Sequence, residues 1–393
     1  MRHSFAHVIG WLLLSLMGLA GCVRDAGPVR FHAHENPRLL GEWNVVRVAE
    51  GQLALNDGVV PFDLNTPLFS DYAHKLRTVW MPKGQAARYH AKESFDFPVG
   101  TILSKTFYYP RLAEDEDADA VTRTYDHSRD HRGEGLDLRQ VRMLETRLLV
   151  RRAHGWDALA YVWNAEQTEA ELARTGASIP LQLVADDGSR EAIAYQVPDQ
   201  NQCAGCHASN NTTRAILPLG PKARHLNRDY AYAGGRENQL AHLARVGYLQ
   251  DVPTAVQAPR NADWRDTSGA SLDARARAYL DINCGHCHNA SGPADTSGLL
   301  LDIDTPMGEQ LGRCKAPVAA GQGTGDHEFD IVPGKPDESI LPYRMLSTDP
   351  AEMMPELGRA TFHKEGVELI REWIAAQSGS CGSPPSSATP ATP

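Results

Sequence analysis

Two short runs in this chain have the residue types and the spacing to attach a porphyrin covalently. The first is Cys203 to His207, with the sequence Cys-Ala-Gly-Cys-His, and the second is Cys284 to His288, with the sequence Cys-Gly-His-Cys-His. Each thiol can add to a vinyl group of the porphyrin, and the adjacent histidine can then ligate the iron. The sequence therefore predicts two covalently bound haem c groups. Their anchors and proximal ligands are Cys203, Cys206 and His207 for the first haem, and Cys284, Cys287 and His288 for the second.

A structural zinc site is the alternative use of two Cys-x-x-Cys pairs. Such a site needs both pairs to meet around one ion, usually across a short ribbon. Here Cys206 and Cys284 lie far apart in the sequence, and zinc does not explain a histidine directly after both pairs. Haem is therefore the favoured interpretation.

A second axial ligand for the second haem is predicted downstream of its attachment run. Met353 and Met354 precede Pro355 on an expected loop before the last helix. A thioether is a soft iron ligand that raises the potential, and Pro fixes the backbone that presents it. Met354 is the predicted ligand and Met353 the alternative, whereas simple packing of both in a core is the other interpretation. Met345 and Met307 are weaker candidates.

The distal position of the first haem stays open at the level of sequence, because no methionine lies between His207 and Cys284. An open, five-coordinate iron, able to bind a small ligand, is equally compatible with the sequence. The candidate ligands are His225, His242, Met81, Met143, His127 and His131.

The N-terminus has the features of a bacterial lipoprotein signal. Arg2 gives a short basic region, the apolar stretch from Val8 to Ala20 is too short to span a membrane comfortably, and small residues precede Cys22. We expect residues 1–21 to be removed and Cys22 to carry lipid, with Val23 favouring the outer membrane. An ordinary secretory signal with a chance cysteine is the alternative. The expected location is the periplasm, with the membrane reached through the lipid anchor.

Charge and the remaining cysteines limit the partners and the compartment. The formal net charge of -10 argues against nucleic acid as a partner and favours basic redox proteins, whose identity as donor or acceptor the sequence does not give. Cys314 and Cys381 remain after the haem and lipid sites are assigned. Because disulfides persist in exported proteins, we predict that these two are bridged, with two buried free thiols as the alternative.

The fold is expected to be mixed, with a β-rich, sandwich- or barrel-like module at residues 22–200 followed by two mostly α haem domains. Alternating patterns predict hairpins over 144–163 and 181–197, and a strand within 95–109. The Glu- and Ala-rich segment 165–174 predicts a short helix. A first haem region at 201–262 includes an expected helix over 236–249. A disordered tail is expected at 382–393.

Residues 263–381 have the order of a class I cytochrome c domain. Ser271 is a candidate N-cap for a helix from Leu272 to Asp281, which leads directly into the second attachment run. A closing helix from Glu365 to Gln377 places apolar residues on one face. In that fold the first and last helices cross, and Trp373 is the candidate aromatic at their contact.

The chain also resembles an uncharacterised family of bacterial dihaem c-type cytochrome lipoproteins. The resemblance covers most of the mature chain. It is carried by both attachment runs with their flanks, and by Leu217 to Lys222, Cys314 with Ala320 to Gly323, Ile331 to Pro336, Met353 to Arg359, Pro67 to Ala73, and Glu145 to Val150. It implies covalent haem and electron transfer, and brings no substrate.

Three function classes follow. The first is an exported dihaem cytochrome that transfers electrons at the periplasm or outer membrane. The second is a dihaem enzyme, either a peroxidase or a small-molecule dehydrogenase, with the first haem as its reactive centre. The third is a binding protein whose β-rich module recognises carbohydrate or polymer. The electron carrier is the favoured class, and no catalytic residue is assigned.

Overall fold

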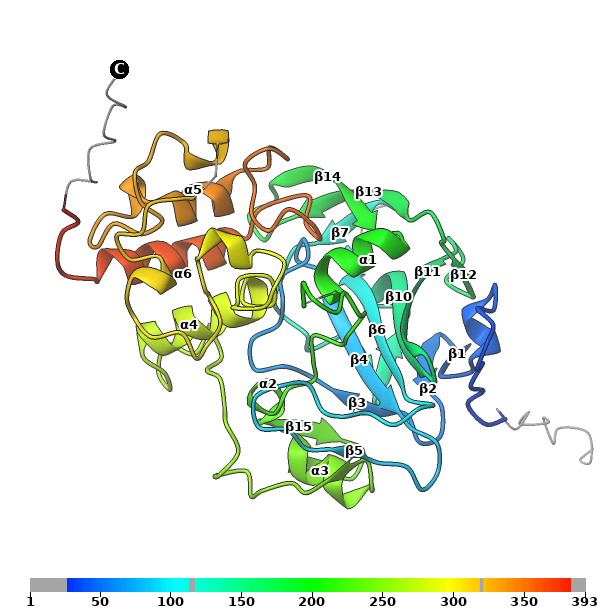
Figure 1. Ribbon diagram of the computed structural model, residues 1–393. Coiled ribbons are helices and arrows are strands. Elements are labelled where there is room, and N and C mark those ends of the chain that lie inside the picture. Colours follow the sequence, from blue (N-terminus) through cyan, green and yellow to red (C-terminus); the bar gives the residue numbers. More distant parts are fainter. Residues whose placement is uncertain (1–26, 113–116, 209, 319–320, 383–393) are drawn as a thin grey trace, which may run out of the picture.

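The structure is a computed structural model that describes residues 27–112, 117–208, 210–318 and 321–382. The expected signal peptide, the lipid-bearing Cys22 and all but the first residue of the expected C-terminal tail lie outside these residues. The described chain has a β-rich N-terminal part and a more helical C-terminal part, which lie side by side (Figure 1).

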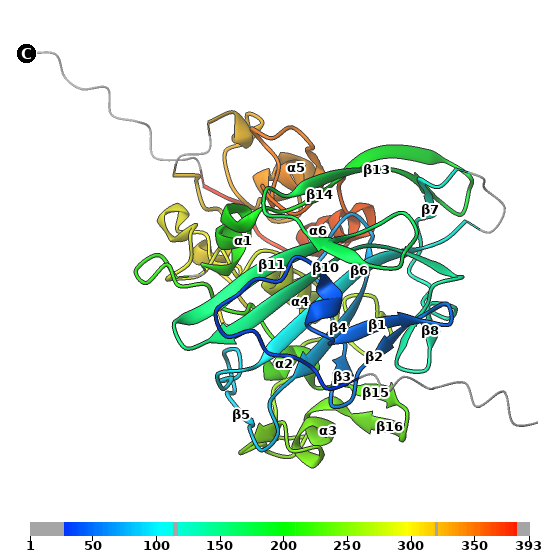
Figure 2. The ribbon, with the colours of Figure 1, turned by 90° about the vertical axis from the view of Figure 1, so that its right-hand side faces the viewer.

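A six-stranded antiparallel sheet forms the framework of the N-terminal part, in the order β12-β11-β10-β6-β4-β3 (Figures 1 and 2). Its strands are β3 (Val60–Phe62), β4 (His74–Trp80), β6 (Ile102–Pro110), β10 (Val141–Arg152), β11 (Gly155–Trp163) and β12 (Ala170–Leu172). A four-stranded sheet contains β1 (Val46–Ala49), β2 (Gln52–Leu55), β9 (Gly135–Asp137) and β8 (His131–Arg132). A three-stranded sheet contains β14 (Arg190–Val197), β13 (Ala177–Val184) and β7 (Ala120–Thr122).

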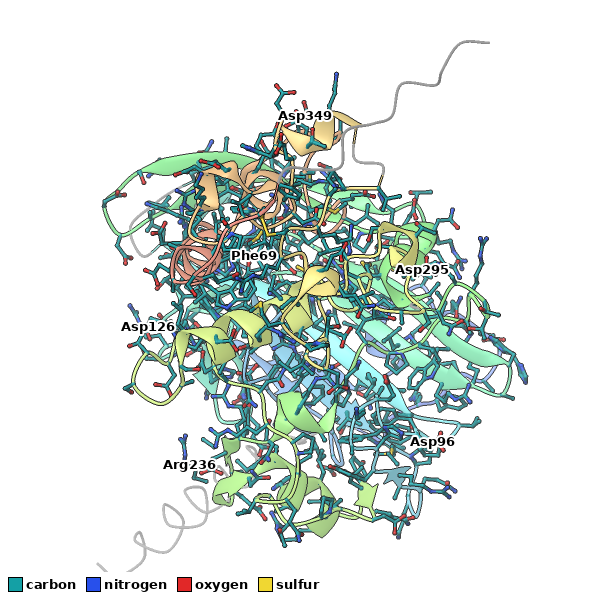
Figure 3. All side chains as sticks on the ribbon, turned by 60° about the vertical axis from the view of Figure 1, so that its left-hand side comes forward. Phe69, Asp96, Asp126, Arg236, Asp295 and Asp349 are labelled. Carbon is teal, nitrogen blue, oxygen red and sulfur yellow. A yellow bond between two sulfur atoms is a disulfide. The ribbon has the colours of Figure 1, made fainter. Side chains whose placement is uncertain are left out.

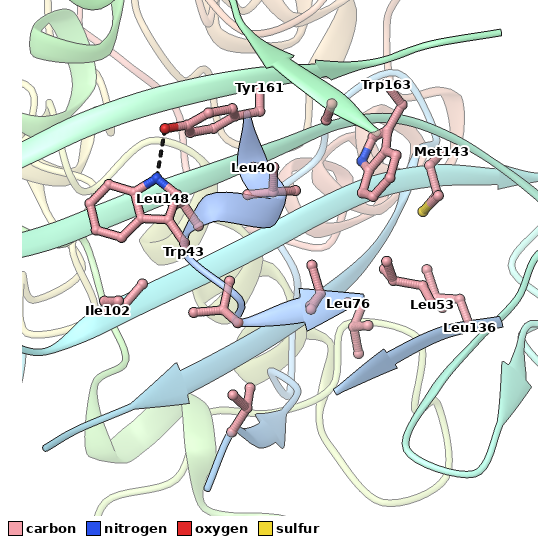
Figure 4. Packing of buried hydrophobic residues seen from close by; sticks show 14 of the residues in the cluster. Leu40, Trp43, Leu53, Leu76, Ile102, Leu136, Met143, Leu148, Tyr161 and Trp163 are labelled. Carbon is pink, nitrogen blue, oxygen red and sulfur yellow. Dashed lines mark hydrogen bonds between the residues drawn. The ribbon is translucent and has the colours of Figure 1, made fainter. Parts of the chain in front are cut away.

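One face of the six-stranded sheet packs on a large apolar core. In this core Trp43 donates a hydrogen bond from Nε1 to the hydroxyl of Tyr161, 2.7 Å away (Figure 4). Leu148 and Val150 of β10 point to this core, so the intervening residues point to the opposite face. A β-bulge between Met143 and Glu145 re-aims β10 and turns Glu145 toward that opposite face.

The hairpins predicted over 144–163 and 181–197 are confirmed as β10–β11 and β13–β14. The helix predicted over 165–174 is wrong, because that segment is a turn followed by the edge strand β12. Gln167 adopts a positive φ of 57°. Its side chain accepts from the backbone N–H of Met143 and donates to its carbonyl, at 2.6 and 3.1 Å. This tertiary pairing outweighs the helical propensity of the segment.

The middle of the chain is less helical than expected. It contains α1 (Gln200–His207), α2 (Ala223–Leu226), β15 (Asp229–Tyr232), β16 (Gly235–Asn238), α3 (Gln239–Arg245) and β17 (Leu249–Gln250). The helix expected over 236–249 is limited to α3, which the Asn238 side chain caps by accepting from the N–H of Leu240. Gly247, with φ of 81°, follows its end. The region joins the β-rich part through parallel pairing of β17 with β5 (Ala87–Arg88).

The C-terminal part contains the two predicted helices as α4 (Leu272–Asn283) and α6 (Lys364–Ala375), with α5 (Ile340–Leu346) beside them. Ser271 caps α4 by accepting from the N–H of Ala274 at 3.2 Å, as expected. Trp373 of α6 donates from Nε1 to Asp273 of α4 at 2.8 Å, so the predicted aromatic contact is present. Short 3-10 turns are η1 (Leu40–Glu42), η2 (Asp295–Ser297), η3 (Glu309–Leu311), η4 (Gly321–Thr324) and η5 (Pro336–Glu338).

A segment between β3 and β4 fastens the two parts together. The backbone N–H of Phe69 donates to the side chain of Asn283, the residue before the second attachment run, at 2.8 Å. The ring of Phe69 stacks on His363 with centroids 4.3 Å apart, near the middle of the molecule (Figure 3). Asp71 accepts from the backbone N–H groups of Ala360 and Thr361 at 2.7 and 2.9 Å.

Cys314 and Cys381 form a disulfide, as predicted, across 67 residues of sequence. A loop of this length limits the unfolded chain enough to stabilise the fold by about 4 kcal/mol in the chain-entropy account. The bridge ties Cys381, close to the end of the described residues, to the loop that follows α4. No helix within the described ranges has the length and apolar character needed to cross a bilayer.

The contact of Asp71 predicts a pH dependence of stability. Burial raises the pKa of Asp71 to about 6 from the ordinary value of 3.8, against the opposing effect of its two backbone donors. The carboxyl is protonated in both states below about pH 4, but above about pH 6 the folded state has to bury the charge. This group therefore destabilises the fold by about 3 kcal/mol as pH rises through that interval, at 1.36 kcal/mol per pH unit.

Asp71→Asn keeps the acceptor oxygen and removes the charge. We expect its free energy of unfolding, relative to wild type, to increase by up to about 3 kcal/mol between pH 4 and pH 7. Urea unfolding at each pH measures this difference, with the exposed Asp57→Asn as the matched control. A pH-independent difference between Asp71→Asn and wild type would contradict the prediction.

Candidate functional site

A cavity of about 1340 Å³ lies between the six-stranded sheet, α1 and the C-terminal helical part. Its volume exceeds the range of roughly 300–1,000 Å³ that is typical of a pocket for one small molecule. Both Cys-x-x-Cys-His runs contribute to its wall, through Cys203, Cys206 and His207 of the first and through Cys284 of the second. The structure therefore brings the two runs to one space, which their separation in sequence does not predict.

The first run is held on α1. Asp199 accepts from the N–H of Gln202 at 2.8 Å, while Gln202 accepts from the N–H of Asp199 at 3.0 Å, which forms a capping box at the helix start. His207 is the last residue of the helix, and its Nδ1 donates to the carbonyl of Leu217 at 2.8 Å. Burial lowers the pKa of His207 to about 4, so the ring is neutral at pH 7 and its Nε2 carries a lone pair.

The second run follows α4 in a tight turn. The N–H groups of Cys287 and His288 both bond to the carbonyl of Cys284, at 3.0 and 2.9 Å. Gly285 is required in this turn, because a Cβ there would lie 2.8 Å from the carbonyl oxygen of Asp281. His288 donates from Nδ1 to the carbonyl of Leu299 at 3.1 Å. The two predicted proximal histidines are therefore oriented by the same type of hydrogen bond.

The two runs are close neighbours. After the first run, Asn211 donates from its backbone to the carbonyl of Ser291 at 2.9 Å and from its side chain to the carbonyl of Gly292 at 2.9 Å. Gly205, inside the first run, packs against Leu357 of the loop that contains Met354, since a Cβ at Gly205 would lie 2.7 Å from its side chain. Two groups attached to these runs would therefore lie next to each other.

The four cysteines of the runs are free thiols, whereas Cys314 and Cys381 are bridged. Burial raises the pKa of each thiol, to about 12 for Cys284 and for Cys287. The charge of Cys206 adds to the effect on Cys287, which again reflects the closeness of the two runs. The thiols are thus protonated at neutral pH and available for a covalent bond.

Met353 and Met354 both line the cavity. The loop that presents them is fixed by a hydrogen bond from the N–H of Met354 to the carbonyl of Arg344 at 2.9 Å, and by Arg359, which donates to the carbonyl of Met354 at 3.0 Å. Met345 also lines the cavity, whereas Met307 is 42% exposed and does not.

Of the six candidates for the distal ligand of the first haem, His225 alone is among the described cavity-lining residues. Its Nε2 donates to Asp281 at 2.9 Å, so that nitrogen is already engaged. His242 stacks on Tyr232, with ring centroids 3.4 Å apart, and is bonded to Glu237. The remaining candidates, Met81, Met143, His127 and His131, are parts of the β-rich module outside the cavity wall.

His127 belongs to a separate cluster that could hold a metal ion. The ligand atoms of His74, His127 and Asp130 all lie within 4.8 Å of one another. Nδ1 of His74 and Nδ1 of His127 both face one oxygen of Asp130, at 2.7 and 3.0 Å, and His74 donates from Nε2 to the carbonyl of Thr124. Hydrogen bonds from the histidines lower the pKa of Asp130 despite its burial, so its carboxylate is ionised.

Three cavity-lining histidines, His154, His286 and His363, are absent from the sequence-based candidates, and His154 faces Asp157 at 3.2 Å. His363 has both nitrogens engaged, with the hydroxyls of Tyr125 and Tyr279 at 2.6 and 2.9 Å. His286 lies inside the second run, and its Nδ1 is buried without a hydrogen-bond partner among the described residues. The position of His286 between Cys284 and Cys287 was a signal available in the sequence.

The carboxylate of Asp281 organises the wall next to the second run. It receives five hydrogen bonds, two of them from Arg224 at 2.8 and 2.9 Å and one each from His225, Asn261 and the backbone N–H of Ile303. Hydrogen bonds from His225 and Arg224 hold the pKa of Asp281 far below its usual range, against the effect of burial. This buried ion pair positions α4, and with it Cys284, against α2.

The donor set fits haem. Each run offers two free thiols and a neutral histidine whose Nδ1 is bound to a backbone carbonyl, the arrangement that orients metal-ligating histidines through Nε2. Comparison of the chain with protein-family models, with curated proteins and with solved structures gives no match. The functional argument therefore depends on the residues of the site.

The Asp281 network predicts a large effect of a small substitution. Asp281→Asn removes the charge and leaves the guanidinium of Arg224 buried without a counter-ion, so we expect the free energy of unfolding to fall by about 3–5 kcal/mol. The double variant Asp281→Asn/Arg224→Met removes both charges and should lose less than the sum of the two single variants. Denaturant unfolding of the four proteins at pH 7 measures this, and additive losses would contradict the prediction.

Proposed function

We propose that this protein is a dihaem c-type cytochrome that transfers electrons. The observation that carries the proposal is that His207 and His288 make the same type of hydrogen bond in the same sequence context. Each donates from Nδ1 to a backbone carbonyl ten or eleven residues downstream, and each follows a pair of free cysteines. Both attachment runs are neighbours, and one cavity takes thiols from both.

The roles of the residues follow from their chemistry. Cys203 and Cys206 would anchor the first haem, and Cys284 and Cys287 the second. When bound, haem supplies a one-electron couple between ferric and ferrous iron. The chain holds the proximal imidazoles neutral and oriented, and it offers the sulfur of Met354 from a loop fixed on its backbone.

The closeness of the two runs favours electron transfer between the haems over two independent functions. Asn211 links the polypeptide after the first run to the residues after the second, and Gly205 packs on the Met354 loop. Electrons entering at one haem would therefore have a short path to the other.

The finer architecture is part of the proposal. The order of α4, the second run, the Met-Pro loop and α6, with Trp373 at the contact of the two helices, supports a class I cytochrome c domain. The β-rich module would cover the first haem with a face of its six-stranded sheet. We further propose export, lipid attachment at Cys22 and docking of basic redox partners on an acidic surface, at the periplasmic side of the outer membrane. The disulfide is compatible with that compartment.

A dihaem enzyme, of the peroxidase or small-molecule dehydrogenase class, is the second candidate function. It is favoured by the engagement of His225 and His363 in hydrogen bonds, which leaves the first iron without an evident sixth ligand from those two residues. A high-spin ferric signal, together with peroxide-dependent oxidation of a reduced donor, would select a peroxidase. Two low-spin irons would select the electron carrier.

Haem counting tests the proposal directly. We expect mass spectrometry of the purified mature protein to find two covalently bound haems. Cys203→Ser/Cys206→Ser and Cys284→Ser/Cys287→Ser should each retain one, because each pair anchors a separate group. Cys314→Ser/Cys381→Ser, which removes the same number of cysteines elsewhere, should retain both. A protein without covalently bound haem, or one that carries zinc instead, would contradict the proposal.

Ligation of the second iron by Met354 predicts a spectroscopic change without loss of haem. In Met354→Ala we expect one of two low-spin ferric EPR signals to change and the midpoint potential of that haem to fall, because a thioether ligand raises it. The control is Met307→Ala, whose side chain is exposed and outside the cavity wall. Unchanged signals in Met354→Ala, with a change in Met353→Ala, would assign the neighbouring methionine instead.

A further inference from the structure

A row of like charges crosses the six-stranded sheet on the face that lines the cavity. Arg77 of β4 lies opposite Lys105 of β6, and Lys105 lies opposite Arg147 of β10. Lys75, two residues from Arg77 on the same face, lies opposite Phe107. All four cationic side chains line the cavity. Because like charges directly opposite one another destabilise a sheet, this row requires anions.

Acidic side chains neutralise the two arginines. Arg77 donates to Asp63 at 2.8 Å. Arg147 donates from Nε to Glu145 at 2.8 Å, and the hydroxyl of Tyr195 holds Glu145 at 2.7 Å from the other side. The planar guanidinium suits such paired contacts with carboxylates. Two positive charges of the row are thus balanced within the chain.

Neither lysine forms an ion pair with an acidic side chain among the described residues, although the charges of Asp71 and Glu145 act on Lys75 and Lys105 from a greater distance. Lys75 donates from Nζ to the carbonyls of Leu68 and Ala73, at 3.1 and 2.8 Å. Nζ of Lys105 lies 5.0 Å from the ring centroid of Phe107, and the structure gives it no hydrogen bond or ion pair within the described ranges. Burial, followed by the neighbouring cations, lowers the pKa of Lys105 to about 7 and that of Lys75 well below its usual value. An anion bound here would restore both charges.

The two lysines share a cavity with the first attachment run. Lys75 and Lys105 line it from the sheet, and Cys203, Cys206 and His207 line it from α1. A haem attached to the first run would therefore occupy the space that both ammonium groups face.

We propose that the ammonium groups of Lys75 and Lys105 bind the two propionate carboxylates of the haem attached at Cys203 and Cys206. The inference rests on the proposed function. Two ammonium groups match two carboxylates in charge. A covalently attached haem would bring both carboxylates with it, which accounts for the lack of an ion-pair partner at either lysine among the described residues. The lysines are positioning residues that hold one edge of the haem against the sheet and set its electrostatic surroundings.

The test uses the haem-loaded, full-length protein. The double variant Lys75→Met/Lys105→Met keeps the apolar stems and removes both charges. Lys105→Arg retains the charge, and the exposed Lys83→Met removes a lysine of the same module outside the cavity wall. Mass spectrometry counts haem in each protein, and a redox titration followed by EPR gives both midpoints. The EPR signal that Met354→Ala alters identifies the second haem.

Fixed positive charge favours the ferrous state, so its removal should disfavour reduction. We expect the equilibrium constant for reduction of the first haem to fall at least tenfold in the double variant, which is about 59 mV for one electron. In Lys105→Arg and Lys83→Met it should stay within threefold of wild type. The single methionine variants give the same comparison if the double variant does not accumulate.

A first-haem equilibrium constant within twofold of wild type, in a double variant that retains both haems, would overturn the inference and leave the proposed function standing. Absence of haem from the wild-type protein would instead remove the proposed function. Added succinate tests whether the carboxylates that bind the lysines come from the haem propionates or from a soluble dicarboxylate. If it shifts the midpoint of the wild-type protein but not of the double variant, the lysines bind a soluble dicarboxylate and the propionate assignment is wrong.

Discussion

The ion pair between Asp281 and Arg224 is the constraint on which the rest of the site depends. Asp281 is one turn before Cys284 on α4, and Arg224 belongs to α2, which follows the first attachment run. The carboxylate also receives His225, Asn261 and the backbone of Ile303. One buried charge therefore fixes α4, which leads into the second run, against α2, which follows the first. Such a pair stabilises a fold only when every lone pair is used, and five donors meet that condition here.

Both faces of the six-stranded sheet pack on apolar clusters, but one face also carries charge between two of them, which lie around Leu103 and around Phe107. The face toward Leu148 and Tyr161 is an apolar core of the usual kind. The opposite face carries Arg77, Lys105 and Arg147 in adjacent strands, where a pattern based on burial alone would place apolar residues. Sequences tend to break local packing rules where function requires it, so this departure marks the sheet as a wall of the site.

Local patterns in the sequence predict the local elements well. The hairpins follow from alternation and turn residues, α4 from the Ser271 cap, and α6 from its apolar face. The disulfide follows from an even pair of cysteines in a chain expected to be exported. The attachment runs could be identified as such, but their nearness could not, because it results from Asn211 and from the Asp281 network. Segment 165–174 shows the reverse case, in which the pairing of Gln167 with β10 overrides local propensity.

The cationic side chains that line the cavity include two contrasting groups. Arg77, Arg147 and Arg224 each have a carboxylate from the chain, and their forked geometry makes them part of the framework. Lys75 and Lys105 form no ion pair with a carboxylate among the described residues. Their ammonium groups are therefore disfavoured, as the lowered pKa values of both lysines show. The arginines have counter-ions from the chain, whereas a bound anion would stabilise the charged form of the lysines. The cross-strand register places Lys105 between Arg77 and Arg147, and in this way it favours an anionic ligand in the cavity.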